Sequence, residues 1–359
     1  MRIALLSTCA VTVPPKGYGG TELVVAELAK ALGSLGHRVT VFATGDSAPG
    51  QAELRWHFPR PVWPPSDVAE LRHAAYAWQA ICAEDPPFDV VHVQQAPAIA
   101  FSAVCPAPTV LTLHHDRADR LLDFYRDFPS VAYVAISHRQ AELIPELAVR
   151  HVVHHGLDVD SYAAGDGSGG WLAFVGRLSR QKGAHLAIDA ARAAGLDLRM
   201  GGQPHWEDEA YFESELRHRF AAADGRVAWE GEVSLAPKLA LLRGARATLF
   251  PIDWEEPFGL VMIESMLVGT PVIAFARGAA REVVDEGVTG FVVRDLPEMV
   301  DRIRRVGSID RARCRQRARE RWNAQRKARD YERVYEAAMR TRREVRTSGA
   351  RARLALDAR

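Results

Sequence analysis

The sequence predicts an α/β protein built from two doubly wound, Rossmann-like domains. The chain has 359 residues, which exceeds what one domain core usually holds. Short apolar runs, typical of parallel strands buried on both faces, alternate with segments of helical periodicity. The alternation stops at a small, polar stretch, residues 163–170, and then starts again.

The first half opens with an apolar run at residues 3–7. We predict a strand there and not a signal peptide, because the run is short and no small-residue cleavage site follows it. Residues 21–35 have helical spacing, with Thr21 as the expected N-cap and Gly36 closing the helix. Further strands are predicted at 39–43, 90–93, 109–113, 131–136 and 152–154, and further helices at about 68–83, 97–104 and 137–147.

The second half repeats the pattern after residues 163–170, which we predict to be a flexible linker. The predicted strands are 172–175, 196–200, 227–229, 247–250, 272–275 and 291–293, and the predicted helices are 184–194, 207–220, 235–243, 257–268 and 297–306. This gives an N-terminal domain, 1–162, and a C-terminal domain, 163–325. A helix of about 326–345 could pack back on the first domain, and 346–359 is expected to be a flexible tail.

The composition excludes several classes of protein. A net charge of +1 provides no field that would attract nucleic acid. The four cysteines are far apart and form no metal-binding or disulfide pattern, so reduced thiols and a cytoplasmic location are expected. No apolar run is long enough to span a membrane, although peripheral contact with the inner membrane face stays open.

The segment from Glu256 to Glu264 carries the first candidate site. Pro257 suits the first position of a helix covering 257–268, because its missing N–H is not needed there. This helix is apolar on nearly every side, so Glu264 in its middle must be satisfied by a partner. Two neighbouring ligand hydroxyls, such as those of a ribose, would satisfy it, and so would an arginine of the same domain. The helix alone does not separate these two interpretations.

Two loops that follow predicted strands carry the other candidates. In the loop after residues 172–175, Arg177 and Lys182 could bind a diphosphate together with the N–H groups of the next helix. Arg180 of the same loop is expected to be solvated. The loop after the first strand contains Gly17, Gly19 and Gly20, which would let a backbone approach a ligand closely. It does not fit a dinucleotide-binding fingerprint, because about ten residues separate it from the strand and the third glycine is missing.

Together these segments resemble the retaining glycosyltransferases with two Rossmann-like domains facing each other across a cleft (the GT-B fold), in particular glycosyltransferase family 4. Glu256 and Glu264 match the Glu-x7-Glu motif of that family within EPFGLVMIESMLVGTPVIA. GRLSRQKG matches its phosphate-binding loop, and GYGGTELVVAELAKALGSLGHRVTVFA matches its N-terminal region. A further matching stretch contains Gly278, Glu282, Gly287, Thr289, Gly290 and Phe291. The resemblance covers roughly residues 1 to 335.

The resemblance implies a retaining, metal-independent transfer of a hexose from a nucleotide-diphosphate sugar, without a cofactor, to an acceptor hydroxyl. The expected donor is a UDP-hexose, with GDP-mannose second, and the acceptor could be a glycan, a lipid or a small metabolite. The implied catalytic residues are His114, Glu256, Arg177 and Lys182. The implied donor-binding residues are Gly19, Gly20, Gly176, Arg177, Lys182, Phe258, Gly259, Leu260 and Glu264. Acceptor contacts are expected at Tyr18, His92, Gln94, His115 and Tyr125.

Two segments need a separate interpretation, and three other functions stay open beside this resemblance. His155 stands where the family often has an asparagine, so we interpret His151, His154 and His155 as hinge residues and not as metal ligands. Asp158-Val159-Asp160 spells a metal–nucleotide motif of a different fold, and we interpret it as structural. A nucleotide-sugar epimerase or phosphorylase of the same fold, a dinucleotide-dependent oxidoreductase and an inactive sugar-binding protein are the alternatives.

Overall fold

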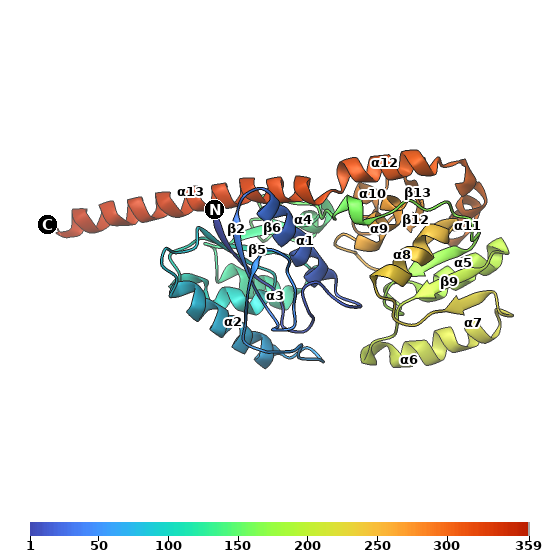
Figure 1. The fold of residues 1–359 in the computed structure, drawn as a ribbon, viewed down its shortest axis with the longest axis horizontal. Helices are drawn as coiled ribbons and strands as arrows, with labels where there is room; N and C mark the ends of the chain where they lie inside the picture. Colours follow the sequence, from blue (N-terminus) through green and yellow to red (C-terminus); the bar gives the residue numbers. More distant parts are fainter. Residues whose placement is uncertain (358–359) are drawn as a thin grey trace.

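The computed structural model describes residues 1–357, with side chains described for 1–344 and for Thr347. It contains two parallel sheets, each in its own domain, placed side by side (Figure 1). In both sheets the strand order follows the doubly wound pattern, in which the chain moves outward in one direction and then restarts beside its first strand. The predicted fold class is confirmed.

The N-terminal sheet has the order β3-β2-β1-β4-β5-β6-β7. Its strands are β1 (Arg2–Leu6), β2 (Arg38–Ala43), β3 (Glu53–Trp56), β4 (Val90–Val93), β5 (Thr109–Thr112), β6 (Ala132–Ala135) and β7 (His151–Val152). The helical elements of this domain are α1 (Gly20–Ser34), α2 (Asp67–Cys82), η1 (Ala96–Val104), α3 (Asp119–Arg126), α4 (His138–Leu143) and η2 (Val159–Ser161). The edge strand β3 was not predicted, because its ELRW segment has no apolar run, and α3 was not predicted either.

The C-terminal sheet has the order β10-β9-β8-β11-β12-β13. Its strands are β8 (Leu172–Val175), β9 (Leu198–Gly201), β10 (Val227–Trp229), β11 (Ala247–Phe250), β12 (Val272–Phe275) and β13 (Gly290–Val293). The helical elements around it are α5 (Ala184–Ala194), η3 (Trp206–Asp208), α6 (Glu209–Tyr211), η4 (Phe212–Leu216), α7 (Arg217–Ala221), α8 (Leu235–Gly244), α9 (Leu260–Leu267), α10 (Ala280–Val283), α11 (Leu296–Arg305), η5 (Val306–Ser308) and α12 (Arg311–Arg321). The single helix predicted for 207–220 is therefore divided among four short elements.

The stretch predicted as a flexible linker, residues 163–170, is tied to the C-terminal domain. The N–H groups of Gly165, Gly167 and Gly169 donate to the carbonyls of Val268, Arg243 and Gly244. Its glycines serve close packing: a Cβ on Gly165 would lie 2.4 Å from the backbone of Arg243. The prediction of flexibility was wrong, because small residues were needed for contact and not for mobility.

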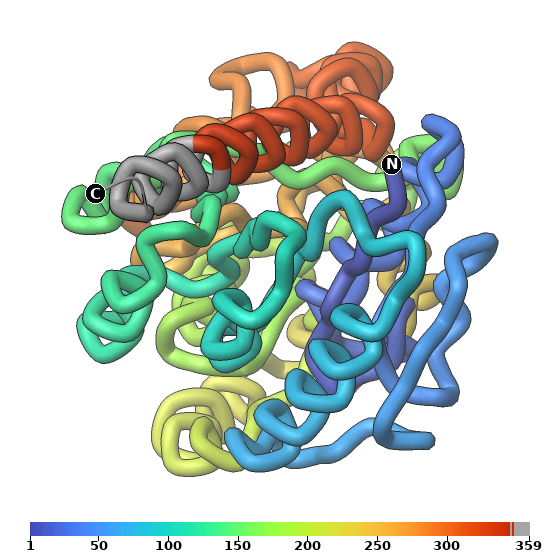
Figure 2. The backbone as a smooth tube through the Cα atoms, turned by 90° about the vertical axis from the view of Figure 1, so that its left-hand side faces the viewer, coloured from blue at the N-terminus to red at the C-terminus, as the bar shows by residue number. Residues whose placement is uncertain are grey.

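The last helix, α13 (Ala324–Asp357), leaves the C-terminal domain and returns over the N-terminal one (Figure 2). Its apolar face, which includes Ala328, Tyr331 and Tyr335, joins the core formed by β1, β2 and α1. The segment expected to be a flexible tail, 346–359, forms the end of this helix as far as Asp357, and Ala358 and Arg359 lie outside the described residues. Among the described helices, none is both long and apolar enough to cross a membrane.

Candidate active site

A cavity of about 880 Å³ lies between the two domains, at the carboxyl ends of both sheets. Doubly wound proteins bind ligands in this position, where the strand order reverses. The cavity collects every predicted donor and catalytic residue, together with one predicted acceptor residue: Tyr18, Gly19, Gly20, His114, Gly176, Arg177, Lys182, Glu256, Phe258, Gly259, Leu260 and Glu264. Residues from loops more than 200 positions apart in the sequence therefore face one space.

Lys182 and Glu256 form an ion pair on the C-terminal wall of this cavity. The Oε2 atom of Glu256 accepts from the Nζ of Lys182 and also from the indole Nε1 of Trp254, at 2.7 Å. The Lys182 ammonium lies 4.8 Å from the centre of the Trp254 ring, which adds a cation–π contact. Because an ammonium has three donors, Lys182 can hold Glu256 and still bind an anionic ligand.

Arg177 lies at the end of β8, beside Lys182. Its Nε is 3.4 Å from the carboxylate of Asp208, and its Nη2 donates to Gln181 at 3.2 Å. The loop then turns into α5 through Gly183, which has a φ of 73° and whose Cβ, if present, would lie 1.9 Å from the carbonyl oxygen of Pro251. Glycine is needed there, and the turn places two cations near the positive end of a helix. Arg180 is exposed, as expected, and pairs with Glu215.

Helix α9 starts later than the sequence predicts. Its first residue is Leu260, and Gly259 occupies the N-cap position with a left-handed φ of 86°. Pro257 therefore lies in the loop before the helix, and the prediction of Pro257 at the first helical position was wrong. A Cβ on Gly259 would lie 2.8 Å from Met262 and 2.9 Å from Phe250, so the glycine cap fixes the entrance. The first N–H groups of α9 are left without partners inside the helix and are available to a ligand.

Glu264 lies one turn into α9 and is only 3% exposed. Its Oε1 accepts from the Nζ of Lys238 on α8, at 2.5 Å. The charge partner is thus a lysine and not the arginine considered from the sequence, which gave no signal for Lys238. Both side chains line the cavity, so the ion pair and a ligand hydroxyl can share the same carboxylate.

His114 faces the C-terminal wall from the end of β5. Its Nε2 is 2.7 Å from the Oε1 of Gln94, and its ring stacks on His155 at 5.8 Å. Burial lowers the pKa of His114 to about 3, with smaller contributions from the Lys327 charge and from His115. The imidazole is therefore neutral near pH 7. With Nε2 donating to the Gln94 amide oxygen, Nδ1 is left as an acceptor for a substrate hydroxyl.

Four of the predicted acceptor contacts do not lie on the cavity surface. His92 is fully buried in β4 and bonds to Tyr335 of α13 and to Thr112. Tyr125 is 1% exposed, and its hydroxyl lies 2.6 Å from His115 Nε2. Gln94 is buried and acts by orienting His114. His92 lies within β4, Gln94 and His115 follow strands, and Tyr125 lies on α3. None of the four lines the cavity, so the structure does not bring these predicted acceptor contacts to it. Tyr18 does line the cavity.

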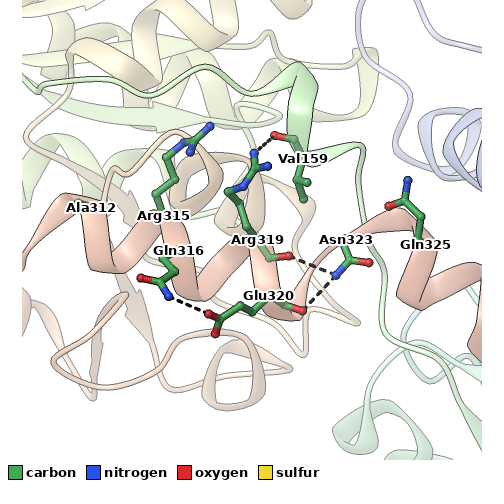
Figure 3. A pocket seen from close by; sticks show the side chains of 8 residues that line it. All are labelled: Val159, Ala312, Arg315, Gln316, Arg319, Glu320, Asn323 and Gln325. Carbon is green, nitrogen blue, oxygen red and sulfur yellow. Dashed lines mark hydrogen bonds between the residues drawn. The ribbon is translucent and has the colours of Figure 1, made fainter.

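The Asp158-Val159-Asp160 segment forms part of the domain junction. Asp158 pairs with Lys30 at 2.6 Å, and Asp160 pairs with Arg319 of α12 at 2.7 Å. Figure 3 shows Arg319 reaching the carbonyl of Val159 beside a shallow hollow on α12. Both aspartates are used in ion pairs outside the cavity, which agrees with a structural role.

Two of the three predicted hinge histidines, His154 and His155, have different surroundings. His154 Nε2 bonds to Glu282 at 2.9 Å, and this carboxylate also accepts from the N–H groups of His138 and Arg139 at the start of α4. The side chains of His138, His154 and Glu282 could reach one metal ion, but three hydrogen bonds already occupy the carboxylate. His155, in contrast, lines the cavity and contacts the Phe258 ring at 4.9 Å. The interpretation of His155 as only a hinge residue was therefore wrong.

Several cavity residues were missed by the sequence analysis. They are Glu22, Trp63, Glu70, Trp206, Glu232 and Lys238. Glu22 stands in the quoted glycine-loop motif, so its place in that motif was an available signal. The others lie outside every motif and come together only through the packing of the two domains.

Comparison with known proteins agrees with this geometry. Residues 18–161 match the family description "Glycosyltransferase Family 4", and residues 168–321 match "Glycosyl transferases group 1". The two matches together cover most of the chain. The chain belongs to the family 4 glycosyltransferases.

The individual relatives share only low sequence identity with this chain. A phosphatidyl-myo-inositol mannosyltransferase of Mycobacterium tuberculosis is 27% identical over 334 residues, covering 83% of this glycosyltransferase and 84% of the relative. AviGT4, a glycosyltransferase involved in avilamycin A biosynthesis, superposes with a TM-score of 0.71 at 24% identity, covering 95% of this chain and 98% of that one. HepE of Anabaena, solved with UDP and glucose, gives a TM-score of 0.73 at 20% identity, covering 94% and 99%. These structures share the GT-B fold with this glycosyltransferase.

Proposed function

We propose that this glycosyltransferase moves a hexose from a UDP-hexose to an acceptor hydroxyl with retention of the anomeric configuration and without a metal ion. The observation that carries the proposal is the grouping of Arg177, Lys182 and Glu264 on one wall, beside the N-termini of α5 and α9. Cations and helix N-termini suit a diphosphate, and a buried carboxylate suits ribose hydroxyls.

The proposed reaction follows from that arrangement. The bond between the anomeric carbon and the β-phosphate oxygen breaks, and a new bond forms from the acceptor oxygen on the same face of the sugar. The acceptor proton leaves with the departing phosphate. Lys182 and Arg177 stabilise the charge that develops on this phosphate, which makes electrostatic stabilisation the main catalytic contribution. The positive charges of Lys182 and Arg177 would play the role that a divalent cation plays in metal-dependent enzymes.

Glu256 and His114 position the transferred sugar. The Glu256 carboxylate, held by Lys182 and Trp254, lies at the entrance of α9, where it can accept from sugar hydroxyls. His114 approaches from the other domain as a neutral hydrogen-bond acceptor. Since the cavity is formed by both domains, their closure excludes water from the reacting centre.

The choice of UDP is supported by HepE, which was solved with UDP and glucose. GDP-mannose is the second candidate, because the Mycobacterium tuberculosis relative is a mannosyltransferase. The same catalytic wall serves both donors, so the base is the point that an experiment must decide.

Thermal shift with UDP, GDP, ADP and the matching sugar nucleotides tests this proposal on the wild type, Lys182→Ala and Glu264→Gln. A ligand at 100 times its Kd stabilises a protein by about 2.7 kcal/mol. We expect UDP to stabilise the wild type and both variants to lose most of that effect. Arg180→Ala is the matched control, since Arg180 is an exposed cation of the same loop that pairs with Glu215. No nucleotide response, or equal responses in all four proteins, would refute the donor site.

Two further measurements test the finer points. NMR of the product gives the anomeric configuration, and inversion would refute the retaining reaction. Activity after treatment with EDTA should equal that of the untreated enzyme, and a loss restored by Mg²⁺ would refute metal independence. Consumption of the donor without an acceptor-dependent glycoside would instead favour an epimerase.

A further inference from the structure

The two walls of the cavity differ in their basic residues. Within the described residues that line it, Arg177, Lys182 and Lys238 all belong to the C-terminal domain. The N-terminal wall has two carboxylates, Glu22 and Glu70, and neither a lysine nor an arginine among its described lining residues. The C-terminal wall also has carboxylates, which belong to Glu207, Glu232, Glu256 and Glu264. The basic side chains that suit a diphosphate are therefore confined to one side, and the opposite side has carboxylates without a described lysine or arginine beside them.

Glu22 and Glu70 stand in the first turns of α1 and α2, so both helix N-termini point toward the same part of the cavity. Glu22 is 5% exposed, and its Oε1 accepts from the Thr8 hydroxyl. No hydrogen bond from a described residue reaches its other oxygen. Glu70 accepts from the Cys9 N–H at 3.1 Å through Oε1, while its Oε2 is buried without a partner among the described groups.

A purely structural role does not account for this pair. Two carboxylates that only stabilised helix N-termini would be equally effective in solvent, where their charge costs little. Here neither has an ion-pair partner among the described residues, and each retains one oxygen that no described group satisfies. Burial raises the pKa of Glu22, and burial together with the Glu22 charge raises the pKa of Glu70 to about 7. A ligand that donates a hydrogen bond would remove this deficit at Glu22, and at Glu70 once its shielded Oε2 turns to the cavity surface.

The mouth of the cavity next to these carboxylates is aromatic. Trp63 and Tyr18 of the N-terminal domain and Trp206 of the C-terminal domain are 56%, 51% and 73% exposed and line the cavity. The His205 ring lies between them, 5.4 Å from Tyr18 and 5.8 Å from Trp63. Exposed rings of this kind offer flat apolar faces with polar edges, which suit the C–H face of a sugar ring.

From the absence of a described lysine or arginine on the N-terminal wall and from the aromatic mouth, we propose that Glu22 and Glu70 bind the hydroxyls of a phosphate-free carbohydrate acceptor, whose ring lies against Trp63 and Trp206. This assignment rests on the proposed function, because it requires the donor on the opposite wall. An acceptor with a phosphate group would meet no described lysine or arginine on that wall, and its negative charge would raise the pKa of both carboxyls further. Glycans and glycosides therefore fit this wall, whereas phosphorylated sugars and phospholipid headgroups do not.

Transfer assays with matched probes test the acceptor class. The enzyme, saturated with the donor identified by thermal shift, is offered p-nitrophenyl β-glucoside, cellobiose, glucose 6-phosphate and myo-inositol 1-phosphate. We expect transfer to at least one phosphate-free probe and a rate at least tenfold lower for both phosphorylated ones. Faster transfer to a phosphorylated probe, or transfer to neither phosphate-free probe, overturns the proposal.

The variants Glu22→Gln and Glu70→Gln test the residues. Each should raise the KM for the accepted probe at least tenfold and leave the nucleotide Kd within about twofold, because the donor wall is untouched. Asp123→Asn, which removes an exposed carboxylate on α3, is the control and should change neither value. An unchanged acceptor KM in both glutamine variants overturns the proposal.

Nucleotide binding in the same proteins separates this proposal from the proposed function. Retained nucleotide binding also shows that the variants are folded. If nucleotides bind and the acceptor predictions fail, the acceptor site alone is wrong. If the wild type binds no nucleotide, the donor site fails first.

Discussion

The buried pair of Lys238 and Glu264 permits a quantitative test of the donor wall. Lys238→Met removes the ammonium, keeps most of the length of the side chain, and leaves the Glu264 carboxylate without its charge partner at 2.5 Å. Glu264→Gln removes the opposite charge. The two side chains differ in exposure, 18% for Lys238 and 4% for Glu264. The two substitutions should therefore differ in cost.

Removal of one partner from a buried ion pair costs about 3–5 kcal/mol. We expect Lys238→Met to cost about 3 kcal/mol, the lower limit, because the cavity gives Glu264 some access to water. Glu264→Gln should cost about 1 kcal/mol, since the flexible, partly exposed Lys238 ammonium can turn to solvent. For a domain of 150–250 residues each kcal/mol corresponds to about 2–4 °C in Tm, which gives decreases of roughly 6–12 °C and 2–4 °C.

Thermal unfolding of the ligand-free single variants and of the double variant measures these costs. The double variant Lys238→Met/Glu264→Gln should be more stable than Lys238→Met alone, because no unpaired buried charge remains. A Tm for Lys238→Met within about 1 °C of the wild type would show that the pair contributes nothing. A larger loss for Glu264→Gln than for Lys238→Met would refute the exposure argument.

Three more predictions concern other parts of the site. Gly183→Ala should destabilise the protein by more than about 3 kcal/mol, because its Cβ would meet the Pro251 carbonyl at 1.9 Å. Gly195→Ala is the control: Gly195 has a similar φ of 69° and no atom within 4 Å, so the substitution should cost about 1–2 kcal/mol. Urea unfolding measures both losses, and equal losses would contradict this prediction. The kcat/KM profile should show no step from His114 between about pH 5 and 8, because burial holds the pKa of this histidine near 3; a step that disappears in His114→Gln would refute its neutral state. Burial acts to raise the pKa of Glu282, but hydrogen bonds from His154 and from the Arg139 and His138 N–H groups outweigh it and lower the pKa below its ordinary 4.5. The stability advantage of the wild type over Glu282→Gln should then be complete above about pH 5 and shrink as pH falls below about 4.5, and a constant gap in urea midpoints would contradict the assignment.

The sequence predicts the donor wall well because the residues of each donor motif are close together along the chain. Arg177, Lys182 and Glu256 each follow a strand end within a few positions, and the parallel sheet then places all strand ends at one edge. The helix entrance was harder to predict. Pro257 and Gly259 are both typical of helix starts, and only the backbone shows that the glycine, in its left-handed conformation, forms the cap.

The acceptor wall could not be predicted from local pattern for a physical reason. His92 was predicted to contact the acceptor because it is a polar residue within a strand near the cleft. Its hydrogen-bond partner is Tyr335, which lies 243 positions later on a helix that returns from the other domain. The His92 side chain therefore forms hydrogen bonds inside the protein and not with a ligand. Glu70 shows the converse case, since its helix supplies no motif, and only the packing of α2 against the loop after β1 brings it to the cavity.

The geometry also explains why two sequence stretches of this family occur together. Gly278 packs so closely on the backbone of Glu256 that a Cβ would lie 2.2 Å from its carbonyl oxygen, and the N–H of Ala279 donates to that same oxygen. Glu255, one residue earlier, accepts from the Gly278 N–H and binds Arg139 of the N-terminal domain. Glu282 holds the start of α4, the helix that carries Arg139. The second stretch therefore supports the loop that presents Glu256 and links it to the opposite domain, so a shift of the domain junction would displace a residue at the reacting sugar. Separate sequence motifs here form one structural unit, in which the junction sets the position of the catalytic carboxylate.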